Sequence, residues 1–127
     1  MAKSFEDLAA WKLAREVTRL IYEISSTGNF CKDFALCNQI RRASISIVSN
    51  IAEGFERNGD KEFLQFLAIA KGSCGEVRAQ LYVAKDQNYI DEKQFISITN
   101  KLVEASRTIS GLMKYLQQSE LRGSKFK

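Results

Sequence analysis

The sequence has no histidine and no proline, and each absence limits what the chain can be. Without histidine it lacks the commonest general base, the commonest metal ligand and the Ser-His and Cys-His pairs of many hydrolases. A ferritin-like di-iron site also needs histidine. Without proline, and with only seven glycines in 127 residues, little interrupts a helix. The sequence therefore predicts long helices and a protein that is not an enzyme, with no metal site and no cofactor.

The three cysteines, Cys31, Cys37 and Cys74, are odd in number and form no CxxC pair. We interpret them as reduced thiols, with Cys37 and Cys74 packed on apolar helix faces. The first residues, MAKSFEDLAAWK, are too polar for a signal peptide, and no apolar run approaches the length of a membrane span. We therefore expect a cytoplasmic protein that makes no contact with a membrane.

The net charge is +4, and most of the excess lies at the C-terminal end. Residues 122–127 contain Arg122, Lys125 and Lys127 and no acid, so the rest of the chain is nearly neutral. We predict one domain over residues 1–121, followed by a basic, disordered tail over residues 122–127. A nucleic-acid-binding face on the domain would require its basic side chains to gather in space.

Apolar residues recur every three or four positions along most of the chain, which is the period of a helix with one buried side. In segment 44–49 polar and apolar residues largely alternate, so this is the one place that also suits a strand. The residues on both sides of it keep the helical period. Four helices with short loops between them predict an all-α, antiparallel up-down-up-down four-helix bundle. The four predicted helical segments are 4–24, 33–54, 63–84 and 91–116.

Local signals predict where these helices begin and end. Ser4 and Asp7 have the spacing of a capping box, as do Asp91 and Gln94. Gly54 is predicted to stop the second helix, because glycine often ends helices.

Two further stripes of residues run along the second and third predicted helices, beside their apolar sides. In the second helix, a polar stripe of mainly short, neutral side chains suits hydrogen bonding between helices. In the third, Gly72 and Gly75 form a stripe with Ala68 and Ala79. Because a glycine in an exposed helix costs about 1 kcal/mol relative to alanine, we predict close packing at Gly72 and Gly75. The approaching helix comes from the same chain or from a neighbouring subunit.

The basic residues of the domain are a modest indication that it binds nucleic acid. No aromatic pattern of an RNA-recognition motif and no helix-turn-helix signature is present. Ordinary solvated surface is the competing interpretation of such a patch. The residues predicted to contact nucleic acid are Arg41, Arg57, Lys61, Lys71, Arg78, Arg122, Lys125 and Lys127.

Several motifs together resemble one known family, the four-helix-bundle 23S rRNA intervening-sequence proteins. The motifs are Phe5-Glu-Asp-Leu8 with Trp11, Gln39-Ile-Arg-Arg-Ala43, Ser49-Asn-Ile-Ala-Glu-Gly54, and Gly72-Ser73 with Glu76. The resemblance implies a homopentamer of antiparallel bundles. It also implies relatedness to the accessory proteins of diversity-generating retroelements, which bind nucleic acid beside a reverse transcriptase.

The motif positions also suggest a polar network that is structural or lies at a subunit interface. Its predicted members are Gln39, Arg42, Asn50, Glu53, Ser73 and Glu76. Glu76 is the expected partner of Arg42, and Glu53→Ala would cost about 2–4 kcal/mol if it left Arg42 buried and unpaired.

Two functions stay open at this point. The first is a non-enzymatic, homo-oligomeric bundle that binds RNA or DNA weakly, or serves as an accessory protein in that setting. The alternative is an oligomeric scaffold or adaptor that binds a protein partner. Salt dependence separates them, because phosphate contacts weaken steeply with salt and an apolar protein interface does not.

Overall fold

A computed structural model describes the backbone of residues 2–126 and the side chains of residues 2–119. Single 3-10 turns precede the first two helices, and the described part of the chain contains no strand. The elements are η1 (Phe5–Asp7), α1 (Ala9–Ser25), η2 (Phe30–Lys32), α2 (Phe34–Glu56), α3 (Asp60–Asp86) and α4 (Glu92–Phe126).

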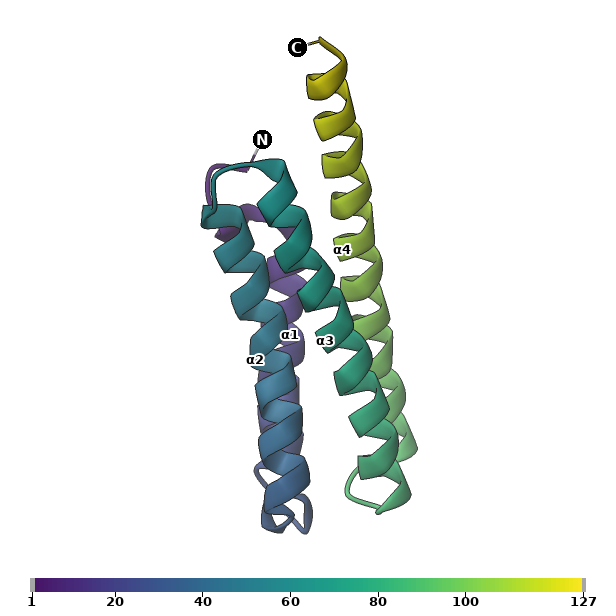
Figure 1. The fold of residues 1–127 in the computed structure, drawn as a ribbon. Helices are drawn as coiled ribbons and strands as arrows, with labels where there is room; N and C mark the ends of the chain where they lie inside the picture. The colour runs from purple at the N-terminus through teal and green to yellow at the C-terminus, as the bar shows by residue number, and fades with distance from the viewer. Residues whose placement is uncertain (1, 127) are drawn as a thin grey trace.

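The four helices form an all-α four-helix bundle. Each helix packs against two others, in the cycle α1–α2–α3–α4 and back to α1. Figure 1 shows successive helices reversing direction at short connections, which is consistent with the predicted up-down-up-down order. The segment 44–49 lies within α2, so its reading as helix is confirmed.

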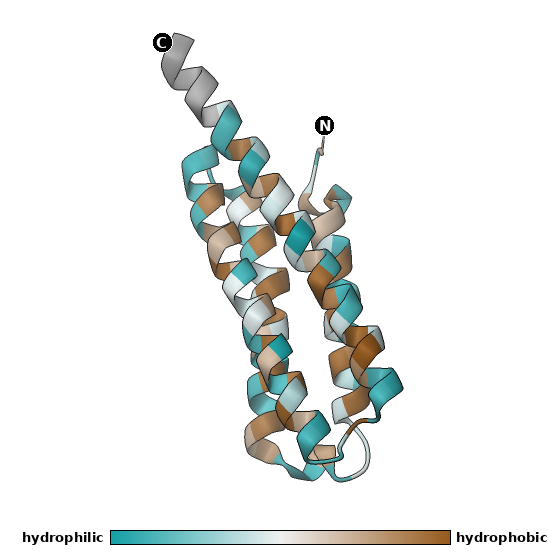
Figure 2. Cartoon of the chain, turned by 90° about the vertical axis from the view of Figure 1, so that its right-hand side faces the viewer, coloured by the Kyte–Doolittle hydropathy of each residue, from teal (hydrophilic) through white to brown (hydrophobic). Residues whose placement is uncertain are grey.

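The core is built from the predicted apolar stripes. Hydrophobic and hydrophilic residues alternate along each helix in Figure 2, as expected when one side of the helix is buried. Side chains from all four helices are fully shielded from solvent, including Ile21, Ile47, Leu67 and Ile109. Cys37 and Cys74 are buried as predicted, and burial raises the pKa of the Cys74 thiol to about 11.

The predicted capping signals are present, but the first one caps only a short turn. Asp91 and Gln94 form a reciprocal capping box, with hydrogen bonds of 2.9 and 2.7 Å to each other's backbone N–H groups. The Asp7 carboxylate accepts from the backbone N–H of Ser4 at 3.3 Å, and this contact caps η1. Leu8 is extended, so α1 begins later than the sequence predicted, at Ala9.

Gly54 does not stop α2, which continues to Glu56. The glycine is buried against α3, and a Cβ atom added to it would lie 2.7 Å from Phe66 Cβ and 2.9 Å from Phe63 Cδ1. Its role is therefore close helix packing. The sequence analysis predicted that role for Gly72 and Gly75 instead.

The side chains of residues 120–127 lie outside the described part of the chain. The contacts predicted for Arg122, Lys125 and Lys127, the domain boundary at residue 121 and the disorder of the tail therefore stay predictions. None of the described helices is both long enough and apolar enough to cross a membrane.

Candidate nucleic-acid interface

A short chain of hydrogen bonds joins α2 to α3 inside the bundle. The Ser73 hydroxyl donates to the Ser46 hydroxyl at 2.9 Å. The Asn50 amide donates to the same hydroxyl at 2.9 Å and to the Ser46 carbonyl at 2.8 Å. Ser73 is buried, and Ser46 and Asn50 are half-buried, so these contacts satisfy polar groups in the seam between the two helices.

The other four members of the predicted network do not join this chain of hydrogen bonds. Gln39 accepts a long, exposed hydrogen bond of 3.5 Å from Gln80. Glu53 pairs with Arg57 at 2.9 Å. Arg42 and Glu76 are exposed, and neither forms an ion pair with a described side chain. Within one chain the six residues therefore do not form a single network, because Arg42, Glu53 and Glu76 point toward solvent.

Glu53 and Arg57 lie one helical turn apart at the end of α2, and both side chains are about half exposed. The exposed fraction of the side chain is 52% for Glu53 and 49% for Arg57. The hydrogen bond from Arg57 to Glu53 raises the pKa of the guanidinium group, which is charged at any ordinary pH. Arg42 is exposed, so the condition under which Glu53→Ala was expected to cost about 2–4 kcal/mol, a buried and unpaired Arg42, does not hold within one chain.

Gly72 and Gly75 are exposed on α3, and among the described residues no atom outside the adjacent turns of α3 lies within 4 Å of a Cβ built on either glycine. No helix of the same chain therefore packs closely against them. Of the two sources that the sequence left open, only a neighbouring subunit could supply such packing.

Three of the predicted nucleic-acid-binding residues lie at the two ends of the bundle. Arg41, near the α1–α2 connection, donates to the hydroxyls of Ser25 and Ser26 and stacks on the Tyr22 ring at 4.4 Å. Arg57 and Lys61 lie at the opposite end, on either side of the α2–α3 loop. Arg41 is thus far from the other two and is occupied by contacts within its own chain.

Two of the predicted residues do share a site. Lys71 and Arg78 line a hollow of about 190 Å³ between α3 and α4, which we call the α3–α4 hollow. The two residues lie two helical turns apart, about 10 Å along α3. None of the residues that line the hollow is acidic: they are Lys71, Cys74, Gly75, Arg78, Leu102, Val103 and Ser106.

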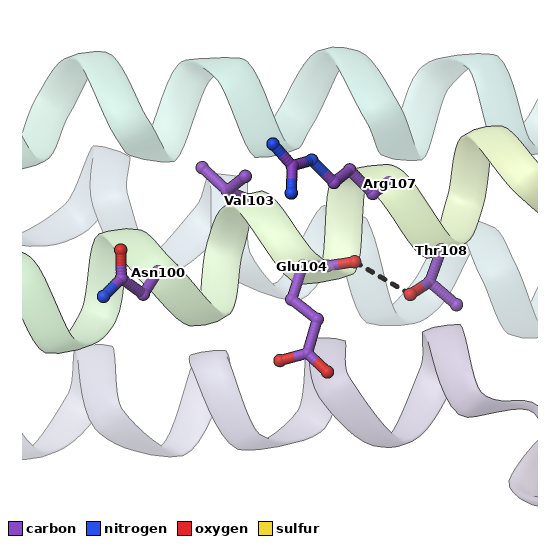
Figure 3. A pocket seen from close by; sticks show the side chains of 5 residues that line it. All are labelled: Asn100, Val103, Glu104, Arg107 and Thr108. Atoms are coloured by element: carbon purple, nitrogen blue, oxygen red, sulfur yellow. Dashed lines mark hydrogen bonds between the residues drawn. The ribbon is translucent and has the colours of Figure 1, made fainter.

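A third basic side chain lies next to this hollow and was missed by sequence reasoning. Figure 3 shows Arg107 and Glu104 extending to opposite sides of α4, Arg107 toward α3 and Glu104 toward α1. Both residues line an adjoining hollow that shares Val103 with the α3–α4 hollow. Finding Arg107 required the alignment of α3 against α4, which spacing along one helix does not give.

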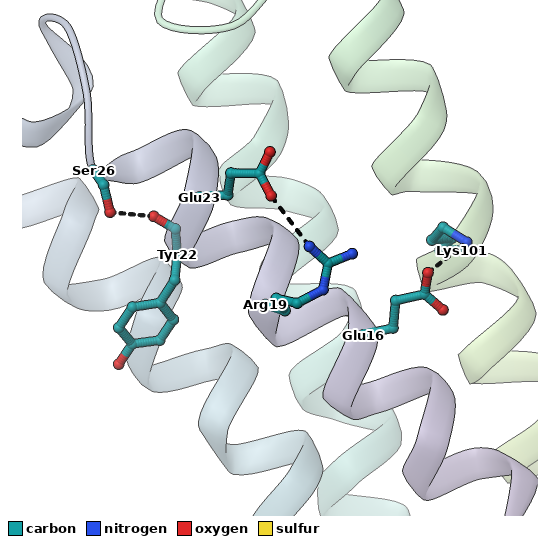
Figure 4. A network of polar contacts seen from close by, with 6 residues as sticks. All are labelled: Glu16, Arg19, Tyr22, Glu23, Ser26 and Lys101. Carbon is teal, nitrogen blue, oxygen red and sulfur yellow. Dashed lines mark hydrogen bonds and ion pairs between the residues drawn. The ribbon is translucent and has the colours of Figure 1, made fainter.

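The surface between α1 and α4 is also basic, but acids neutralise much of it. Figure 4 shows Glu16 paired with Lys101 across the two helices at 3.1 Å, and Glu23 paired with Arg19 along α1 at 3.2 Å. Sequence reasoning did not select this surface. A hollow on α1 itself is lined by Lys12, Arg15, Glu16 and Arg19, so an acid lies among the basic residues there too.

The outward face of α3 carries two exposed apolar side chains. Ile69 and Val83 have exposed fractions of 52% and 46%. Between them, at steps of three and four residues, lie the exposed small residues Gly72 and Ala79 and the exposed Glu76. This face and the α3–α4 hollow are neighbouring surfaces of the same helix. Among the described residues, no group of three or more His, Cys, Asp or Glu side chains could hold a metal ion.

Comparisons with known proteins agree with this architecture. No functionally curated protein matches the chain. A Bacteroides thetaiotaomicron protein of unknown function from the S23 ribosomal protein family has a similar crystal structure, with a TM-score of 0.76 and 25% sequence identity. The match covers 83% of this chain and 95% of that one. Residues 6–111 match the family model described as 23S rRNA-intervening sequence protein. The chain belongs to the family of 23S rRNA-intervening sequence proteins.

Proposed function

We propose that this protein binds nucleic acid through phosphate contacts at the α3–α4 hollow, without catalysing a reaction. The observation that carries the proposal is the pair Lys71 and Arg78 in a hollow with no acidic lining residue. Arg107 adds a third positive charge from α4. Phosphate contacts from lysine and arginine supply most of the affinity of non-specific nucleic-acid binding.

The absence of ion pairs to Lys71 and Arg78 among the described residues also supports this choice of site. Neither Lys71 nor Arg78 forms an ion pair with a described acidic side chain. By comparison, Arg19, Arg57, Lys85 and Lys101 each lie within ion-pair distance of a glutamate. A side chain with no carboxylate partner can contact a phosphate without first losing an ion pair.

We further propose that the chain assembles with copies of itself through the outward face of α3. The exposed Ile69 and Val83, with Gly72 open to solvent between them, support this proposal. The family resemblance implies five copies. A ring would repeat each α3–α4 hollow around the assembly, and several weak sites acting on one nucleic acid bind far more tightly than one site. An Ile69→Glu variant that keeps the mass of the wild-type oligomer would contradict this interface.

The binding proposal is tested by fluorescence anisotropy with a labelled RNA and a labelled duplex DNA. The variant is Lys71→Gln/Arg78→Gln. The matched control is Lys12→Gln/Arg15→Gln, which removes the same charge from the α1 surface. We expect the first pair to weaken binding clearly more than the control. Equal weakening by both variants would mean that net charge, and not this hollow, determines binding.

The alternative function is an oligomeric scaffold that binds a protein partner. The observation that favours it is the exposure of Ile69 and Val83 on the outward face of α3. If the wild-type protein binds neither RNA nor DNA even at low salt, this alternative replaces the nucleic-acid proposal.

A further inference from the structure

We infer that the α3–α4 hollow takes single-stranded nucleic acid in preference to a duplex, and that Tyr82 is the platform on which a base stacks. The inference rests on the proposed function and adds to it the class of nucleic acid and one residue outside the basic cluster.

Tyr82 continues the line of residues that forms one wall of the hollow. Lys71, Gly75, Arg78 and Tyr82 are spaced four, three and four residues apart along α3. Residues at this spacing lie on one side of a helix, and Arg78 and Tyr82 are neighbours on its surface. Tyr82 is 53% exposed, although a large aromatic side chain is normally more buried. An aromatic ring therefore lies one turn beyond the basic residues, open to solvent.

The ring of Tyr82 is held in place from below. It packs against the ring of Phe95 on α4, with 4.9 Å between the ring centroids and 64° between the planes. Phe95 is buried, with an exposed fraction of 7%, and Lys85 Nζ lies 4.6 Å from its ring centroid. A ring already held by neighbours loses little conformational freedom when a base stacks on it.

The charges around Tyr82 define the direction in which a strand would run. Lys85 is paired with Glu92 at 2.6 Å, and the exposed Asp86 follows at the end of α3. These acids are unfavourable for phosphates beyond Tyr82. From Tyr82 toward Lys71, in contrast, the lining of the hollow is free of acids. The site therefore offers one base platform at one end and phosphate contacts along the rest.

An aromatic platform beside basic residues distinguishes between forms of nucleic acid. A base in a single strand can leave its neighbours and stack on the tyrosine, whereas the faces of bases inside a duplex are covered. Replacing a stacking aromatic residue with alanine typically weakens single-strand binding about 5- to 100-fold. Binding to the duplex, which uses phosphate contacts alone, should change little.

The test compares Tyr82→Ala and Tyr82→Phe with the wild-type protein. The probes are a short labelled RNA designed not to pair with itself and the same RNA annealed to its complement. The control is Tyr115→Ala, which removes a tyrosine of similar exposure, 57%, from another hollow, near the α2–α3 loop. Circular dichroism and thermal melting establish that all variants are folded.

We expect Tyr82→Ala to lose about 5- to 100-fold in affinity for the single strand and to leave duplex binding nearly unchanged. Tyr82→Phe, which keeps the ring, should bind like wild type, as should Tyr115→Ala. If Tyr82→Ala binds the single strand normally while Lys71→Gln/Arg78→Gln weakens both probes, the stacking inference is wrong and the phosphate site stands. If the wild-type protein binds neither probe, the proposed function fails, and the inference fails with it.

Discussion

The close approach of α2 and α3 at Gly54 predicts a strong effect of adding one methyl group. In Gly54→Ala, the new Cβ atom would lie 2.7 Å from Phe66 Cβ and 2.9 Å from Phe63 Cδ1. Phe66 Cβ is attached directly to the backbone of α3, so a rotation of the side chain cannot relieve the contact. The two helices must therefore move apart at Phe66, whereas the contact with Phe63 can also be relieved by a shift of its ring.

Two opposing effects determine how much Gly54→Ala changes the free energy of unfolding. Extra methyl groups in a well-packed core typically cost about 1–3 kcal/mol. Replacing glycine with alanine inside a helix contributes up to about 1 kcal/mol in the other direction. The second effect can be measured separately with Gly111→Ala, because Gly111 is exposed on α4 and has no atom within 4 Å of an added Cβ.

We therefore expect Gly54→Ala to be less stable than Gly111→Ala by about 1–3 kcal/mol, which is the cost of the steric contact alone. Urea unfolding followed by circular dichroism measures this difference, at a protein concentration that gives all variants the same oligomeric mass. Equal stabilisation by the two alanines would refute the close approach of α2 and α3 at this position.

Three further predictions follow from other contacts. Glu53→Ala should cost less than about 1 kcal/mol in urea unfolding, because its partner Arg57 is half exposed; a loss of several kcal/mol would point to a buried partner that one chain lacks. Tyr89→Phe removes a hydrogen bond of 2.9 Å to Asp33, the N-cap of α2, and should lower the melting temperature, whereas an unchanged melting temperature would contradict this. Burial raises the pKa of Cys74 from its ordinary 9.0 to about 11, so the folded state holds this proton more tightly than the unfolded chain and stability is lost as pH rises through that range. Cys74→Ala should reduce this loss by on the order of 3 kcal/mol, and an identical pH dependence in both proteins would argue against burial as the cause.

The fold could be predicted from the sequence because the signals for it are local. Apolar spacing identified all four helices, and the capping box at Asp91 and Gln94 is formed. The errors arose where two helices meet. In the sequence Gly54 resembles a helix stop. In the structure a glycine is needed there because α3 packs too closely to leave room for a Cβ atom. Nothing within α2 itself distinguishes the two roles of a glycine.

The candidate site was only partly predictable, for a related reason. The sequence predicted Lys71 and Arg78 as separate candidate contacts, and the structure brings them to one hollow. Arg107 could not be selected, because its place depends on how α4 is aligned against α3. The pairing of Arg42 with Glu76 was plausible from spacing, but both side chains are exposed. Spacing fixes the side of a helix, and only packing fixes whether that side meets another helix or solvent.

The most direct test of phosphate binding at the α3–α4 hollow is the salt dependence of affinity. The logarithm of the binding constant for a single-stranded RNA is measured against the logarithm of salt concentration, for wild type and for Lys71→Gln/Arg78→Gln. Each lost phosphate contact reduces the steepness of this line by about 0.7 for a single strand. We predict a line for the double variant that is less steep by about 1.4. Parallel lines for the two proteins would mean that Lys71 and Arg78 do not contact phosphates, and the central claim would be wrong.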